Sequence, residues 1–110
     1  MLAFCAYYEG TVKGSEAEFD AYVQEIHLPL VAKYPKLQQL RYQKGVVRDG
    51  QVPKFYLTFE LFFNDWDDFE VAKNSSERAL AVEDALKLEA MFEGDIHHVV
   101  YDNQEVAVAS

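Results

Sequence analysis

The segment 53–63, PKFYLTFELFF, constrains the fold more than any other part of this 110-residue chain. It is rich in aromatic residues and follows Arg48-Asp49-Gly50-Gln51, whose Asp-Gly pair is typical of a tight hairpin turn. In a strand, alternate side chains point to opposite faces. One predicted face is apolar and carries Phe55, Leu57, Phe59, Leu61 and Phe63, and the other is mixed and carries Tyr56, Thr58, Glu60 and Phe62. Such a mixed face is expected to lie against another subunit or around a cavity.

Aromatic and β-branched residues predict further strands over 2–12, 37–47 and 96–101, and the strand over 37–47 should pair antiparallel with that over 53–63. A first helix should begin at Ser15, where Glu18 completes a capping box. Its expected apolar stripe is Phe19, Tyr22, Val23, Ile26 and Leu30. The helix is expected to stop at Tyr34-Pro35.

A second helical region should begin at Asn64 or Asp65, with Trp66 and Phe69 on its inner face. It is either one long helical region or two helices separated by a polar break at Asn74-Ser75-Ser76. The part that ends at Gly94 carries the apolar residues Leu80, Leu86, Leu88 and Met91.

This order of elements predicts an α+β fold, the ferredoxin-like β-α-β-β-α-β unit with a four-stranded antiparallel sheet. Its helices would cover one side of the sheet only. Two such sheets packed face to face would form a dimeric α+β barrel, so we expect a homodimer. We expect one domain over residues 1–103, followed by a C-terminal tail or dimer arm over 104–110 that could add a short edge pairing at 106–108.

Composition argues against several classes of partner. The net charge of -9 opposes nucleic-acid binding, because such binding depends on clustered Lys and Arg. No stretch approaches the roughly 20 apolar residues of a membrane-spanning helix, and the first residues lack the basic start of a signal peptide, so we expect a cytoplasmic protein. The single cysteine, Cys5, agrees with a reducing compartment. No metal and no cofactor are expected, and the acidic run over 67–70 is explained by a helix N-terminus.

His27 is the strongest candidate for chemistry. It lies on an apolar helix face, two residues before Pro29, which has no N–H and should kink or end the helix. The negative end of a helix favours imidazolium and burial favours the neutral ring, so the protonation state should be balanced near neutrality. The alternative is a core histidine that bonds to a backbone carbonyl. By contrast, His97 and His98 are adjacent on a strand, so at most one of them enters a pocket.

Four segments carry a family likeness: Glu18-Phe19, EIHLPL at 25–30, YPKL at 34–37 and ELFFNDWDDF at 60–69. In these segments the chain resembles the EthD family, and the likeness extends from Leu2 to about Asp102. The family usually has glycine where this chain has Lys36, so the local turn is expected to differ. The resemblance implies a dimeric α+β barrel, a fold shared with muconolactone isomerases, cofactor-free quinone-forming monooxygenases and haem-degrading monooxygenases. Members of the family are associated with ether degradation.

The resemblance also implies site residues. Methylmuconolactone methylisomerase is similar to this family and is thought to hold its lactone near the matching helix histidine, which implies His27 as the catalytic residue. By position alone, either Arg41 or Tyr42 would meet a substrate carboxylate or carbonyl, since the two point to opposite faces. Glu60 either pairs with Arg41 or Lys44 across the hairpin, or lies inside the barrel and orients a histidine or a ligand hydroxyl. Four tyrosines either pack with a polar tip or line a cavity: Tyr7, Tyr8, Tyr56 and Tyr101.

Two functions remain open at this point. One is a small cofactor-free enzyme, an isomerase or a monooxygenase, that acts by proton transfer on a cyclic or aromatic oxygenated metabolite through His27. The other is a non-catalytic accessory dimer that binds a small hydrophobic compound for a partner oxygenase in a degradation pathway. A haem-degrading role is less favoured, because those relatives share only the fold.

Overall fold

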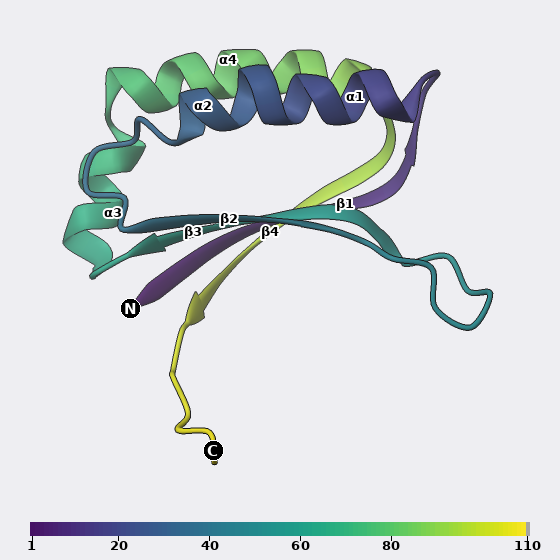
Figure 1. Ribbon diagram of the computed structural model, residues 1–110. Coiled ribbons are helices and arrows are strands. Elements are labelled where there is room, and N and C mark those ends of the chain that lie inside the picture. Colours follow the sequence, from purple (N-terminus) through teal and green to yellow (C-terminus); the bar gives the residue numbers. More distant parts are fainter. Residues whose placement is uncertain (110) are drawn as a thin grey trace.

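The computed structural model of the chain describes residues 1–109. The elements, in chain order, are β1 (Leu2–Val12), α1 (Glu16–Tyr22), η1 (Val23–His27), α2 (Leu28–Val31), β2 (Gln39–Lys44), β3 (Phe55–Phe63), α3 (Trp66–Lys73), α4 (Ser76–Ala90) and β4 (Phe92–Asp102). The strands form one antiparallel sheet in the order β2-β3-β1-β4. All helices lie on one side of this sheet (Figure 1). The predicted ferredoxin-like α+β fold is therefore confirmed.

The first helical segment contains a π turn. Ser15 caps α1 as predicted, since its hydroxyl accepts a hydrogen bond from the Glu18 N–H at 3.2 Å. Of the two predicted effects of Pro29, a kink or an end of the helix, the end does not occur, because the helix continues to Val31. Over η1 the helix widens, and the N–H of Leu28 bonds to the carbonyl of Val23. We attribute the continuation to Val31 to this wider turn, which relieves the clash of a proline ring with the preceding carbonyls.

The π turn also changes which side chains face the sheet. The buried residues at successive turns are Phe19, Val23, His27 and Val31. Ile26, predicted to lie on the apolar stripe, is 46% exposed. A regular helix has 3.6 residues per turn, and the wider turn shifts the inward position from residue 26 to residue 27. His27 is thereby turned toward the interior.

A β-bulge changes the predicted alternation at the start of β3. Tyr8 pairs with Leu57 and Glu9 pairs with Phe55, so Tyr56 is left between them. Tyr56 faces the helices and donates a hydrogen bond to Asp20 of α1 at 2.8 Å. The prediction that Phe55 shares a face with Leu57, and that Tyr56 lies opposite, is therefore wrong for these two residues.

The second helical region consists of two helices, α3 and α4, which have Asp65 and Ser75 as their N-caps. Trp66, predicted to lie on the inner face, is instead 56% exposed, so that prediction is wrong. Two apolar residues of α4, Leu80 and Leu86, are also more than half exposed. The buried residues of α4 are Ala81, Asp84 and Leu88. This helix therefore buries a carboxylate where sequence analysis placed only apolar side chains.

Two facing glycines let β1 and β4 approach closely. β4 begins at Phe92, so Gly94 lies within the strand and does not end α4 as predicted. Gly94 pairs with Gly10, and both have φ 145°. A Cβ at position 94 would lie 2.0 Å from the carbonyl oxygen of Glu9. Only glycine fits both the conformation and the space.

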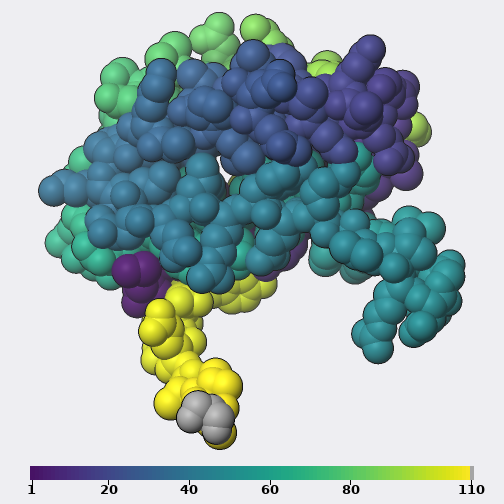
Figure 2. All heavy atoms as spheres, in the orientation of Figure 1, coloured from purple at the N-terminus to yellow at the C-terminus, as the bar shows by residue number. Residues whose placement is uncertain are grey.

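The face of the sheet opposite the helices is open. Ala3, Cys5 and Phe62 form a small buried cluster there, and Tyr7 packs against it. Beyond Asp102 the chain runs away from the sheet (Figures 1 and 2). Residues 103–109 have no regular secondary structure, so the short edge pairing at 106–108 does not form. The alternative, an arm over a partner, stays a prediction, and Ser110 of that arm lies outside the described residues. Within residues 1–109, no helix has the length and hydrophobicity needed to cross a membrane.

Candidate functional site

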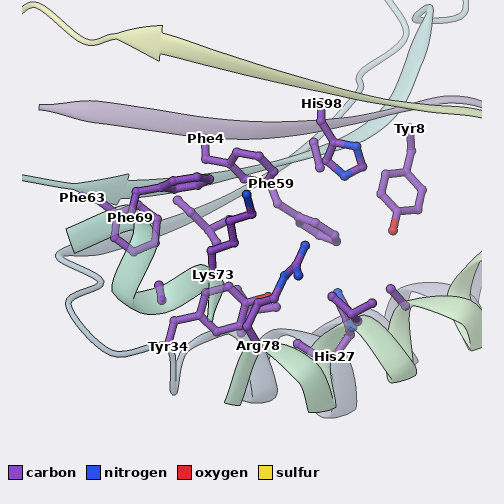
Figure 3. A pocket seen from close by; sticks show the side chains of 17 residues that line it. Phe4, Tyr8, His27, Tyr34, Phe59, Phe63, Phe69, Lys73, Arg78 and His98 are labelled. Atoms are coloured by element: carbon purple, nitrogen blue, oxygen red, sulfur yellow. The ribbon is translucent and has the colours of Figure 1, made fainter. Parts of the chain in front are cut away.

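The helix layer and the sheet enclose a cavity of about 370 Å³, a size that suits small organic ligands. Figure 2 shows a narrow opening between the blue helical segment and the teal strands below it. The aromatic residues of the cavity wall are Phe4, Tyr8, Tyr34, Phe59, Phe63 and Phe69. Its ionisable residues besides tyrosine are His27, Lys73, Arg78 and His98. Figure 3 shows His98, Phe4 and Tyr8 pointing down from the strands, and His27, Tyr34 and Arg78 rising from the helical side.

His27 lies in the cavity wall and is only 5% exposed. Its Nδ1 is 3.0 Å from Oδ2 of Asp84, which is 6% exposed on α4. The other carboxylate oxygen of Asp84 accepts a hydrogen bond from the Tyr22 hydroxyl at 2.5 Å. A carboxylate only accepts hydrogen bonds, so it holds the proton of the neutral imidazole on Nδ1 and leaves Nε2 with its lone pair free.

Burial decides the charge of the imidazole. It lowers the pKa of His27 below its usual value of 6.5, and the hydrogen bond and negative charge of Asp84 offset this only in part. The ring is therefore mostly neutral at pH 7. The hydrogen bond to Asp84, followed by burial, raises the pKa of Tyr22 to about 12, so Tyr22 remains a hydrogen-bond donor. Together the three groups form a chain Tyr22–Asp84–His27 that ends at a neutral base.

Tyr8 is the second predicted site residue in the cavity wall. Burial, and then the charge of Glu89, raises the pKa of Tyr8 well above its usual value, so its hydroxyl stays protonated. Figure 3 shows this hydroxyl directed toward the helical side, where His27 lies. The structure therefore brings Tyr8 and His27 to one cavity.

Tyr42 lies beside this cavity without forming part of its wall. Its ring centroid is 5.9 Å from that of Phe59, which in turn lies 5.7 Å from the ring of His27. Within residues 1–109 the buried Tyr42 hydroxyl makes no hydrogen bond of regular geometry, although the Gln24 side chain is near enough to act on its pKa. Buried polar atoms are seldom left unpaired, so a ligand contact at Tyr42 stays a prediction.

Arg41 and Glu60 lie on the open face of the sheet, away from His27. They are directly opposite each other on β2 and β3. The guanidinium of Arg41 is 5.3 Å from the ring centroid of Phe62, and Glu60 accepts a hydrogen bond from Gln43 at 2.9 Å. Arg41 and Glu60 therefore do not line the cavity that contains His27, and their predicted role in ligand binding could apply only to the open face.

Sequence analysis missed Asp84, Lys73 and Arg78. Asp84 has a signal in the sequence, since Ala81, Asp84 and Leu88 are spaced by three and four residues and so share one helix face. The two cations flank the break between α3 and α4, and no local pattern indicates that they line a cavity. Of the adjacent histidines, His98 lines this cavity and His97 bonds to Glu9 at 2.8 Å on the open face, as the predicted alternation requires. Within residues 1–109 no three His, Cys, Asp or Glu side chains are grouped to hold a metal ion.

Solved structures of similar fold support this architecture. An EthD family protein from Bacillus halodurans C-125 is 23% identical, with a TM-score of 0.80, over 94% of this chain and 99% of that chain. SnoaB from Streptomyces nogalater, a cofactor-independent oxygenase, is 19% identical, with a TM-score of 0.65, over 96% of this chain and 94% of that chain. A dimeric ferredoxin-like protein of unknown function from Thermobifida fusca YX is 14% identical, with a TM-score of 0.66, over 91% and 88%. At these identities the likeness is one of fold.

The family itself is identified by sequence. A comparison with curated proteins finds no match. The model of the EthD domain matches residues 13–88, which include the helix that carries His27 and the whole of α3. This match covers well over half of the chain, and the chain therefore belongs to the EthD family.

Proposed function

We propose that this protein is a cofactor-independent enzyme that acts by proton transfer on a cyclic or aromatic oxygenated metabolite, with His27 as its catalytic residue. One observation carries the proposal: His27 lines a cavity of about 370 Å³ while Asp84 holds its Nδ1 at 3.0 Å. A histidine that served packing alone would not need a free ring nitrogen beside a ligand-sized cavity. The fold shared with SnoaB, a cofactor-independent oxygenase, agrees with the proposal.

The chemistry follows from the tautomer. Nε2 of neutral His27 would take a proton from a carbon next to a carbonyl, which leaves an enolate and an imidazolium paired with Asp84. Return of the same proton to another carbon gives an isomer, with no change in oxidation state. With molecular oxygen as co-substrate, the carbanion carbon would instead form a C–O bond to O2, and the imidazolium would return its proton to give a hydroperoxide. Where that carbon still carries a hydrogen, loss of water breaks the O–O bond and leaves a carbonyl, so one oxygen atom enters the product and the other leaves as water. General base catalysis of this kind typically accelerates a reaction 10²- to 10⁴-fold.

Tyr8 would assist as the ligand-binding residue. Its protonated hydroxyl would donate a hydrogen bond to the carbonyl oxygen, which gains negative charge as the proton leaves carbon. The aromatic walls would hold the ring of the metabolite and exclude water from the enolate.

The test is a panel of lactones, quinols and polyketide-like phenols, with native protein and His27→Gln. We expect kcat/KM to fall about 10²- to 10⁴-fold in the variant. His97→Gln is the matched control, since that ring lies on the open face and outside the cavity, and it should keep native activity when light scattering shows the same oligomeric state as native protein. Turnover unaffected by His27→Gln would remove His27 from the mechanism. Tight binding with no turnover of any compound would favour a non-catalytic binding protein.

We also propose that the chain forms a homodimer through the open face of its sheet. A shallow hollow on that face is lined by Tyr7, Phe55, Val99 and Tyr101, among others, and Val99 and Tyr101 are exposed. Large apolar groups gathered on one face are typical of an interface. Light scattering should give twice the chain mass at micromolar concentration, and Val99→Arg should shift the protein toward a monomer. A native protein that is monomeric under these conditions would contradict the proposal.

A further inference from the structure

The ionisable side chains of the cavity wall besides tyrosine can carry positive charge, whereas the chain as a whole is negatively charged. The protein has 19 Asp and Glu against 10 Lys and Arg. Among residues 1–109, the cavity wall nevertheless contains Lys73, Arg78, His27 and His98 and no carboxylate. Asp84 contacts His27 from outside the wall. In a chain so acidic, a ligand cavity free of acid and carrying two permanent cations indicates selection for negative charge.

We propose that the cavity binds ring compounds that carry a carboxylate, with Arg78 and Lys73 at the carboxylate and His27 at the reacting carbon. The proposal rests on the function proposed above, because it assigns a substrate class to the same cavity. It makes Arg78 and Lys73 specificity-determining residues.

The two cations lack other partners. Within residues 1–109, neither Arg78 nor Lys73 takes part in a side-chain ion pair. The cation–π contacts of the chain involve other cations, namely Arg41, Lys44 and Lys54. The neighbouring acid, Glu77, accepts a hydrogen bond from the Ser76 hydroxyl at 3.2 Å and is not part of the cavity wall. The guanidinium of Arg78 therefore keeps its hydrogen-bond donors available for a ligand.

Arg78 is directed into the cavity. Figure 3 shows its guanidinium rising from α4 toward the space below Phe59, with Lys73 extending from the end of α3 beside Phe4 and Phe69. Its positive charge acts on two other residues of the wall: it opposes the burial that raises the pKa of Tyr34, and it adds to the burial that lowers the pKa of His98. Arg78 thus lies within electrostatic reach of both the helical and the strand side.

The shape of the two groups suits a carboxylate on a ring. A guanidinium binds a carboxylate through two parallel hydrogen bonds, and an ammonium adds a compact positive charge. The aromatic walls beside them suit a flat apolar body. Both cations are exposed residues, so they reach the cavity from its rim and stay in contact with water. A neutral ligand would gain no charge-assisted hydrogen bond from them, whereas a carboxylate would.

The experiment compares two probes of equal shape, 2-naphthoate and 2-naphthamide, by isothermal titration calorimetry at pH 7.5. A charge-assisted pair of hydrogen bonds should make the native protein bind the acid at least about 10-fold more tightly than the amide. Arg78→Met should weaken this preference, Arg78→Met combined with Lys73→Met should abolish it, and both variants should leave amide binding unchanged. Raising the salt concentration should weaken acid binding and not amide binding. Arg48→Met, at an exposed arginine of the hairpin loop, is the matched control and should behave as native protein.

Equal affinity for the two probes, no measurable binding of naphthoate, or an acid preference that survives when Arg78 and Lys73 are both replaced by Met would each overturn the inference. The outcome is separate from that of the proposed function. His27→Gln should keep the preference for the acid, because Arg78 and Lys73 are intact. His27-dependent turnover of neutral compounds, with no acid preference, would leave the proposed function standing and this inference refuted. A preference for the acid without any turnover would support this inference and count against the proposed catalytic function.

Discussion

Replacing Asp84 with alanine should destabilise the protein by about 2–4 kcal/mol. The carboxylate accepts two hydrogen bonds, at 3.0 Å from His27 and 2.5 Å from Tyr22. Hydrogen bonds to a charged group are worth about 1.5–3 kcal/mol each. The lower part of their sum applies for two reasons: alanine favours the helix by about 0.5 kcal/mol, and the Tyr22 hydroxyl is only partly buried and can bond to water instead. Against a typical domain stability of about 5–15 kcal/mol, such a loss is large.

Urea unfolding followed by circular dichroism, at pH 7.5 and one fixed protein concentration, measures this loss. Glu83→Ala is the matched control, because Glu83 is the preceding residue of α4 and is exposed. It should change stability by less than about 0.5 kcal/mol. Tyr22→Phe should cost about 1 kcal/mol in native protein and almost nothing in Asp84→Ala, since its partner is then gone. A loss below about 1 kcal/mol for Asp84→Ala would refute the view that this carboxylate anchors both partners.

Three further predictions concern His27 and the strained backbone positions. Burial lowers the pKa of His27 in the folded protein, so below about pH 6.5 the unfolded chain binds more protons than the folded one. The stability that depends on the neutral ring is therefore present above about pH 6.5 and is lost as pH falls through the folded-state pKa. In urea unfolding, the free energy of unfolding of His27→Gln should fall less steeply below about pH 6.5 than that of native protein. Gly94→Ala should cost about 3 kcal/mol or more, or prevent folding, because the added Cβ would lie 2.0 Å from a carbonyl oxygen. Gly14→Ala is the control, since position 14 has open space around it, and it should cost only about 1 kcal/mol. Thermal unfolding measures both changes. Lys36 has φ 67°, a conformation that glycine adopts without strain. Lys36→Gly should therefore raise the free energy of unfolding by up to about 1 kcal/mol, after the greater freedom of glycine in the unfolded chain is subtracted. Lys36→Ala, which keeps a Cβ, should leave the free energy of unfolding unchanged.

Local signals predicted most of the fold. The Asp-Gly pair of the hairpin has positive φ at both Asp49 and Gly50, as its turn type requires. The expected cap at Ser15 is formed. These features depend on a few neighbouring residues and on periods of 2.0 and 3.6, so they can be read without knowledge of the tertiary contacts.

The errors occur where the backbone departs from a regular period. The π turn moves the inward position from Ile26 to His27, and the bulge at Tyr56 reverses the faces of two aromatic residues. Each irregularity inserts one residue into a repeat, so every assignment that assumes an unbroken repeat shifts beyond it. Sequence analysis identified His27 from the proline after it, but expected a helix end to supply the negative charge. The structure supplies it from Asp84, a residue 57 positions away.

The Tyr22–Asp84–His27 chain depends on two irregular features acting together. A regular helix would carry Ile26 to the cavity and turn the imidazole aside, and a wholly apolar α4 would leave the ring with no group to select its tautomer. Sequestering a carboxylate and an imidazole from water is costly, and well-packed hydrocarbon at both positions is often at least as stable. Packing alone therefore does not account for the arrangement. A neutral imidazole with a fixed tautomer lies in the wall of a cavity whose other ionisable groups besides tyrosine are Lys73, Arg78 and His98. The proposed proton abstraction from an anionic ring compound would require this arrangement.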